Sequence, residues 1–380
     1  MAVNCLRLLE ARGVSVWQDE ITRREVTSGE LKKRIVEDGL SGVLSNPAIL
    51  HTAVSNSTDY DATIARLTRE GKDPPTIVDD IIVEDVRDAA DVLLPVWEQT
   101  NGRDGFACID APIWLTYDSD ACIVEAHRLW DAVDRPNLMI TVPGSVEAIP
   151  AIWQCLVDGL NINVGLLSSV EGYTAVVEAY LDAIETRLVR GLSVDRVASV
   201  ASFLVNPVDS IVNRTIETLL KTTSRPATRA KLEGLVGKIA IANAKLAYAR
   251  FAEVFSPADD RWDKLLDGGA QPQRLLWTGM TMTEPSRRDV LYVEELIAPH
   301  TVVTLSPATL AAFREHGAVR GDTATEGIGE ARKLMQALCD VGVDAGYLSR
   351  QLEDEAVDRL KATYTILLDD VTLKGGAGSV

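Results

Sequence analysis

Cysteine and histidine, the residues that most often build disulfide frameworks and metal centres, are scarce in this chain. Five cysteines lie at positions 5, 108, 122, 155 and 339 without a C-x-x-C pair, and four histidines lie at 51, 127, 300 and 316 without ligand spacing. This pattern argues against a disulfide scaffold, a zinc ribbon and a histidine-rich metal site. It favours a reducing cytoplasm as the compartment, and we expect no metal.

Positive charge is also in short supply. The 380 residues carry 38 Lys and Arg against 56 Asp and Glu, which gives a formal net charge of −18. Nucleic acids and anionic membrane surfaces are bound by basic faces, so we expect neither as a partner. General solubility explains the acidity more simply.

Long apolar runs are missing as well. No stretch reaches the roughly twenty apolar residues that a membrane-spanning helix needs. The first residues, MAVNCLRLLEARG, lack a long apolar core and carry Glu10 early, so we expect no secretion signal. The predicted class is therefore a soluble globular protein.

What the sequence does contain is an alternation of short apolar runs with long amphipathic segments. We predict eight strands at 14–19, 41–45, 105–110, 137–142, 161–166, 197–205, 273–279 and 301–305. Nearly continuous apolar strands separated by helices are typical of a parallel sheet covered by helices. Eight such units favour an α/β fold of the (β/α)8 TIM-barrel type over an open sheet.

The helices outnumber those of a minimal barrel. We predict one barrel domain over 1–372, with a helical insertion at about 220–268 and a long C-terminal helix over 346–372. The last residues, 373–380, are glycine-rich and are expected to form a flexible tail.

Polar residues recur where the predicted strands end, at the face where barrel enzymes build their active sites. They are Asp19, Asn46, Cys108 with Asp110, Thr141, Asn161 with Asn163, Ser202 and Thr278. One such residue is usually a hydrogen-bonded core group, but one on nearly every strand exceeds what packing requires. We therefore predict a polar mouth that binds a small molecule with hydroxyl or carbonyl groups.

Several stretches, read in order, resemble one family. They are VSVWQDEITR, LSGVLSNPAIL, NLMITVPGSVEAIPAIWQCLVDGLNINVGLL, VASVASFLVNPVDSIVN, GKIAIANAKLAYARF and QRLLWTGMT. Together they are similar to transaldolases of the long bacterial form, over nearly the whole chain. The resemblance implies a class I aldolase-type barrel without metal or cofactor. In that family a lysine on the fourth strand forms a Schiff base with a ketose phosphate.

The resemblance also implies roles for individual residues. The acid–base Asp of the first strand corresponds to Asp19, and the ligand-binding Asn of the second strand to Asn46. The fifth-strand Asn corresponds to Asn163 and the sixth-strand Ser to Ser202.

Other positions depart from the family pattern. The Schiff-base lysine corresponds to Thr141, the third-strand Glu to Asp110 and the fifth-strand Thr to Gly165. The phosphate-binding cations correspond to Pro207 and to Thr283 or a neighbour. A hydroxyl cannot condense with a ketone to an iminium, and each lost cation removes a charge-assisted contact of roughly 1.5–3 kcal/mol.

Three hypotheses follow. The first is a repurposed enzyme, with a role in specialised metabolism, that uses Asp19 and Asp110 for acid–base chemistry on a non-phosphorylated small molecule, such as cyclisation, isomerisation or an aldol-type step. Its pocket would include Asn46, Thr141, Asn163, Ser202, Cys108 and Gly165. The second is an inactive binding or regulatory protein, and the third is a transaldolase with a displaced lysine.

Cys108 fits a buried packing residue better than a nucleophile. The sequence leaves the oligomeric state open, with a homodimer among the options.

Overall fold

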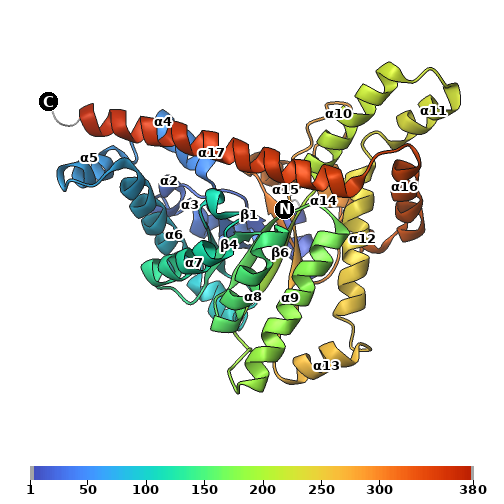
Figure 1. Cartoon of the computed structure of the whole chain (residues 1–380). Coiled ribbons are helices and arrows are strands. Elements are labelled where there is room, and N and C mark those ends of the chain that lie inside the picture. Colours follow the sequence, from blue (N-terminus) through green and yellow to red (C-terminus); the bar gives the residue numbers. More distant parts are fainter. Residues whose placement is uncertain (1–3, 378–380) are drawn as a thin grey trace.

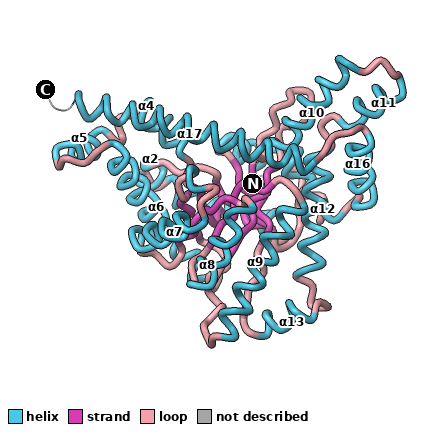
Figure 2. The backbone as a smooth tube through the Cα atoms, in the orientation of Figure 1, coloured by secondary structure: helices cyan, strands magenta, loops and turns pink. Residues whose placement is uncertain are grey.

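The strands of the chain form a closed parallel barrel, seen here in a computed structural model that describes residues 4–377. The strand order β1-β2-β3-β4-β5-β6-β7-β8 follows the sequence, and β8 pairs with β1. Figure 2 shows the strands at the centre, surrounded by helices. The predicted (β/α)8 barrel is confirmed.

Each predicted strand is present, with ends shifted by a few residues. The strands are β1 Val14–Gln18, β2 Leu40–Leu44, β3 Phe106–Asp110, β4 Leu138–Pro143, β5 Ile162–Leu167, β6 Ser199–Leu204, β7 Arg274–Thr278 and β8 Thr301–Leu305.

Helices cover the barrel on all sides (Figure 1). They are α1 Cys5–Ala11, α2 Arg23–Thr27, α3 Glu30–Asp38, α4 Pro47–Asn56, α5 Asp61–Arg69, α6 Pro74–Gln99, α7 Ser119–Val133, α8 Ile149–Asp158, α9 Val170–Val189, α10 Asn206–Thr222, α11 Pro226–Leu235, α12 Ile239–Val254, α13 Asp260–Asp267, α14 Leu291–Glu295, α15 Pro307–His316, α16 Ile328–Asp340 and α17 Ala345–Ala377. A short 3-10 turn, η1, spans Ile113–Leu115.

The inside of the barrel is filled by large side chains from alternate strand positions. Trp17, Phe106, Met139 and Leu276 are fully buried there. Gly42 makes room for the indole of Trp17, because a Cβ at position 42 would come within 2.5 Å of its ring. The interior is therefore solid, and any ligand must bind at an end of the strands.

Polar groups close the end of the barrel where the strands begin. Asp104, just before β3, accepts hydrogen bonds from Trp17 Nε1 at 3.0 Å and Arg274 Nη2 at 3.1 Å. Arg274 also donates to Ser15 Oγ at 2.7 Å. This buried ion pair fastens β1, β3 and β7 together below the core.

The insertion before β7 is broken into separate helices. Pro226 starts α11, since proline fits the first turn of a helix, and Gly237 adopts a positive φ of 64° between α11 and α12. The predicted helical insertion at about 220–268 therefore consists of several helices.

The C-terminal helix α17 lies across several other elements, as its red ribbon shows in Figure 1. Its Leu367 and Val371 pack with Leu50, Val54 and Ile64 in a second apolar cluster. Near its start, Ser349 Oγ lies 2.6 Å from Ser168 Oγ, just after β5. The helix continues to Ala377, so residues 373–377 are helical where we expected a tail, and 378–380 lie outside the described residues.

Candidate active site

Four of the predicted site residues come together on neighbouring strands. Asp110 lies opposite Thr141 in the β3–β4 register, and Thr141 lies opposite Asn163 in the β4–β5 register. Ser202 Oγ donates to Asn163 Oδ1 at 2.6 Å, and Asn163 Nδ2 donates to Thr141 Oγ1 at 3.2 Å. The Thr141 hydroxyl in turn hydrogen-bonds to Asp110. A continuous series of hydrogen bonds thus runs from Ser202 on β6 to the carboxyl group of Asp110 on β3.

The carboxyl group of Asp110 is surrounded largely by protein, although the residue keeps some exposure to a neighbouring cavity. Burial raises its pKa to about 6, while the hydrogen bond from Thr141 acts in the opposite direction. Its backbone N–H donates to Ser45 Oγ at 3.3 Å, which fixes the end of β3. Such a carboxyl group can exchange a proton near neutral pH.

Asp19 follows β1 and is the second carboxylate of the mouth. Its N–H donates to Leu305 O at 3.2 Å, which ties it to the end of β8. Burial raises the pKa of Asp19 to about 6, and a hydrogen bond with its own backbone lowers it in part. Both predicted acid–base residues therefore have pKa values shifted toward neutrality.

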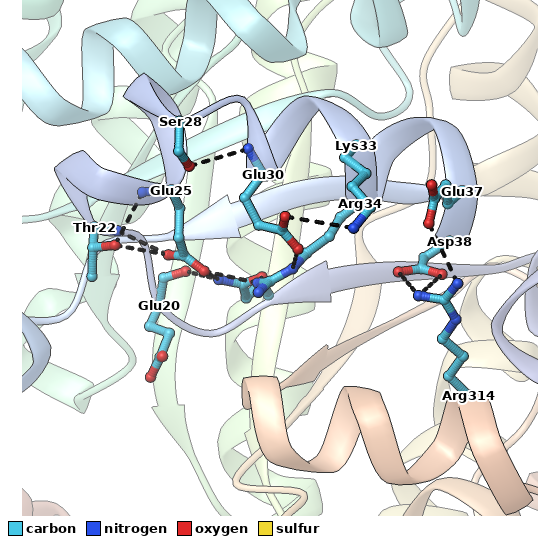
Figure 3. Close-up of polar contacts among 11 residues, drawn as sticks. Glu20, Thr22, Glu25, Ser28, Glu30, Lys33, Arg34, Glu37, Asp38 and Arg314 are labelled. Carbon is cyan, nitrogen blue, oxygen red and sulfur yellow. Dashed lines mark hydrogen bonds and ion pairs between the residues drawn. The ribbon is translucent and has the colours of Figure 1, made fainter.

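Glu20, which we did not predict from the sequence, also belongs to this end of the barrel. Burial and the charge of Asp19 are the main causes that raise its pKa to about 7. Figure 3 shows its carboxyl group pointing away from the ion pair of Glu25 with Arg34, whose closest atoms are 2.8 Å apart. Its position directly after Asp19 was the signal available in the sequence.

Asn46 has a structural role in addition to any role in binding. Its Oδ1 accepts a hydrogen bond from Ala48 N at 2.9 Å and so caps the start of α4. The following Pro47 occupies the first helical position, which proline favours.

Asn161 does not belong to the mouth, contrary to the prediction. It precedes β5, where its side chain donates to Leu138 O at 2.9 Å and accepts from Ala198 N at 2.9 Å. Asn161 therefore joins the beginnings of β4 and β6, at the opposite end of the strand from the mouth.

Cys108 lies two residues before Asp110 and is fully buried. Burial, with a smaller effect of Asp110, raises the pKa of its thiol well above the ordinary range. A thiol held in the neutral form is a poor nucleophile, which supports a packing role.

The two positions at which the resemblance implies phosphate-binding cations, 207 and 283, carry no basic side chain. Pro207 lies in the first turn of α10, and Thr283 Oγ1 contacts Asn206 Oδ1 at 3.5 Å. The nearby Arg287 donates to Gly237 O at 2.6 Å, and Arg288 forms an ion pair with Glu294 at 2.7 Å. These guanidinium groups are committed to protein partners.

Lysine is absent from every strand. Within residues 4–377, the one lysine that is buried is Lys245, on α12, and its Nζ lies 3.4 Å from Glu295 Oε2. Thr141 therefore stands in the mouth without a primary amine on its own or a neighbouring strand.

A cavity of about 530 Å³ opens beside this mouth. Asp110, Thr141 and Gly165 line its inner part, whereas α6, α7, η1 and α17 supply its outer wall. This volume is within the range of small-molecule sites.

Comparison with known proteins agrees with this architecture. Residues 16–371 match the family described as Transaldolase/Fructose-6-phosphate aldolase. The chain belongs to this family. A protein of Trichodesmium erythraeum named Transaldolase is 38% identical over 376 residues, covering 98% of each chain. One of Thermobifida fusca with the same name is 41% identical over 366 residues, covering 96% of this chain and 97% of the relative.

The transaldolase-family resemblance inferred from the sequence is thus confirmed. No helix within the described part of the chain combines the length and apolarity needed to cross a membrane.

Proposed function

We propose that this transaldolase-family barrel is an enzyme that moves protons on a small molecule with adjacent carbonyl and hydroxyl groups, without forming a Schiff base. The observation that carries the proposal is the pair of mouth carboxyl groups, Asp19 and Asp110, each with a pKa raised to about 6. Two such groups can be present in opposite protonation states near neutral pH and divide the acid and base roles.

The hydrogen-bond chain supports an assignment of those roles. Thr141 donates to Asp110 and so favours its ionised form. Asp110 takes a proton from the carbon beside the substrate carbonyl, and the bonding electrons move toward the carbonyl carbon. Protonated Asp19 gives its proton to the carbonyl oxygen, which yields an enol. Asp110 then returns its proton to the former carbonyl carbon while Asp19 takes the proton of the neighbouring hydroxyl, which becomes the new carbonyl and completes the isomerisation.

The same enol can attack a second carbonyl carbon, which gives an aldol-type step. Because Thr141 corresponds to the family lysine, the substrate itself must accept the electrons that the iminium would otherwise hold. Arg287 and Arg288, which follow β7, are already bound to Gly237 O and Glu294. This supports a substrate without a phosphate group.

A transaldolase that acts on sugar phosphates through a displaced lysine is the second candidate. The names of relatives at 38% and 41% identity favour it. It requires an amine from outside the strands to reach the mouth. A binding or regulatory protein without catalysis is the third candidate, and no specific contact favours it.

Borohydride trapping separates the first two candidates. The chain is treated with fructose 6-phosphate and borohydride, and its intact mass is measured. We expect no covalent adduct for the natural chain. The Thr141→Lys variant serves as the matched control because it places an amine in the mouth. An adduct on the natural chain would replace the first candidate by the second.

Deuterium exchange tests proton transfer directly. Hydroxyacetone is incubated with the protein in D2O, and NMR follows the loss of hydrogen from the carbons beside its carbonyl. We expect exchange that falls by about 100-fold or more in Asp110→Asn and in Asp19→Asn. Exchange that equals the buffer rate for the natural chain would favour the binding protein.

A further inference from the structure

The cavity beside the mouth has a different chemistry from the mouth itself. Beyond Asp110 and Thr141, its wall is made mainly of apolar side chains, including Ile113, Trp114, Leu360 and Tyr364. Trp114 and Tyr364 contact each other with ring centroids 4.9 Å apart. Trp114 is nevertheless 47% exposed, so a large aromatic surface remains open to the cavity and the solvent.

The backbone of β5 is shaped to form the inner wall of this cavity. Pairing with β6 shifts register between Val164 and Leu167, and Leu166 adopts a positive φ of 62°. A bulky residue in the left-handed region is strained, and bulges of this kind redirect side chains next to functional sites. As a result Leu166 lines the cavity.

Gly165 keeps the connection between the mouth and the cavity open. A Cβ at this position would lie 3.2 Å from the methyl group of Thr141, closer than most such contacts. The hydroxyl of Thr141 is engaged by Asn163, so the residue presents a polar side to the mouth and a methyl group toward Gly165.

Arg128 is the one basic residue among the described residues that line the cavity, and carboxylates at the outer rim already engage its guanidinium group. Arg128 donates to Asp79 through both terminal nitrogens, at 2.9 and 2.6 Å, and its Nε donates to Glu125 at 2.9 Å. Two carboxylates on one guanidinium leave the rim with a net negative charge. A phosphate at this end of the ligand is therefore disfavoured.

We infer that the substrate carries an uncharged apolar group that occupies this side cavity while its hydroxy-carbonyl end lies at Asp110 and Thr141. This inference rests on the proposed function and names its substrate class: hydroxy-ketones or hydroxy-aldehydes with an aromatic or branched aliphatic substituent. Leu360 and Tyr364, one helical turn apart on α17, then select the substituent by contact.

A matched pair of ligands tests the inference. Hydroxyacetone carries a methyl group where phenacyl alcohol carries a phenyl ring, and both keep the same hydroxy-ketone end. Isothermal titration calorimetry on the full chain gives the two dissociation constants. We expect phenacyl alcohol to bind at least about tenfold more tightly, the scale of discrimination that an apolar pocket provides.

Variants locate the source of that preference. Leu360→Trp fills the cavity and Tyr364→Ala removes part of its wall, so both should lower the affinity for phenacyl alcohol by about tenfold while hydroxyacetone changes less than about twofold. Ile366→Trp, at a position of α17 that is 50% exposed and does not line the cavity, is the control and should preserve the preference.

Equal affinities of the two ligands, or no measurable binding of phenacyl alcohol, would overturn the inference. The inference would also be overturned if both Leu360→Trp and Tyr364→Ala still bound phenacyl alcohol more tightly than hydroxyacetone by the same factor. Failure of the proposed function has a different signature, because it removes deuterium exchange of hydroxyacetone without changing the preference between the ligands.

Discussion

Asn163 Nδ2 donates a hydrogen bond to Thr141 Oγ1 across neighbouring strands, over 3.2 Å. The contact joins the fourth strand to the fifth at the level of the mouth, and the Thr141 hydroxyl donates a hydrogen bond to Asp110. We therefore expect Thr141 to position the carboxyl group of Asp110 on β3.

Thr141→Val tests this relationship because valine keeps the shape and removes the hydroxyl. Asp110 loses the hydrogen bond that favours its ionised form, so its pKa should rise, and the pH at which deuterium exchange reaches half its maximum should move upward. The unpaired amide of Asn163 should lower the free energy of unfolding by about 1–3 kcal/mol. Thr141→Ser retains the hydroxyl and is the control; an unchanged pH profile in Thr141→Val would contradict the role.

Asp110 should also make stability depend on pH. Its pKa is about 6 in the folded chain against 3.8 for an unperturbed Asp, so the folded state binds the proton more tightly. The contribution of protonated Asp110 to stability is therefore complete below the unfolded-state pKa of 3.8. It is lost as the pH rises through the folded-state pKa of about 6. Urea unfolding of the natural chain and of Asp110→Asn should differ by an amount that falls by about 2 kcal/mol from pH ~4 to pH ~7. A difference that stays constant over this window would show that the pKa is not raised.

Two substitutions of Asn46 can separate its role in capping α4 from a role in binding the substrate. Asn46→Ala removes the side-chain acceptor for Ala48 N and should lower the free energy of unfolding by about 1 kcal/mol. Asn46→Ser restores a cap but not the amide. If Asn46→Ser recovers stability and deuterium exchange together, Asn46 contributes only as a cap; recovery of stability alone indicates that its amide contacts the substrate.

The ion pair of Asp104 with Arg274 should be among the contacts most sensitive to substitution. Both side chains are buried, and Asp104→Ala leaves the charge of Arg274 without its partner. We expect the free energy of unfolding to fall by about 3–5 kcal/mol, as measured by urea titration. Glu330→Gln breaks the exposed pair with Lys333 and is the control, with an expected change below about 0.5 kcal/mol. Similar effects of Asp104→Ala and Glu330→Gln would contradict the conclusion that the buried ion pair stabilises the end of the barrel where the strands begin.

Local patterns in the sequence were sufficient to predict the class of fold and the face of the barrel on which the candidate site lies. Apolar strands alternating with helices predicted the barrel, and side chains that alternate along a strand put Asp110, Thr141 and Ser202 at its mouth. The absence of lysine from the strands was also legible in the sequence. These properties depend on local patterns, which the sequence displays directly.

Which of these polar groups contact one another depends on how the strands and helices pack. The β4–β5 register joins Thr141 to Asn163 and leaves Asn161 at the opposite end of β5. The bulge at Leu166 and the packing of α17 create the side cavity. Its wall therefore combines residues that lie more than two hundred positions apart in the sequence. Register, bulges and the docking of a distant helix arise from many contacts at once, so no local pattern in the sequence specifies them.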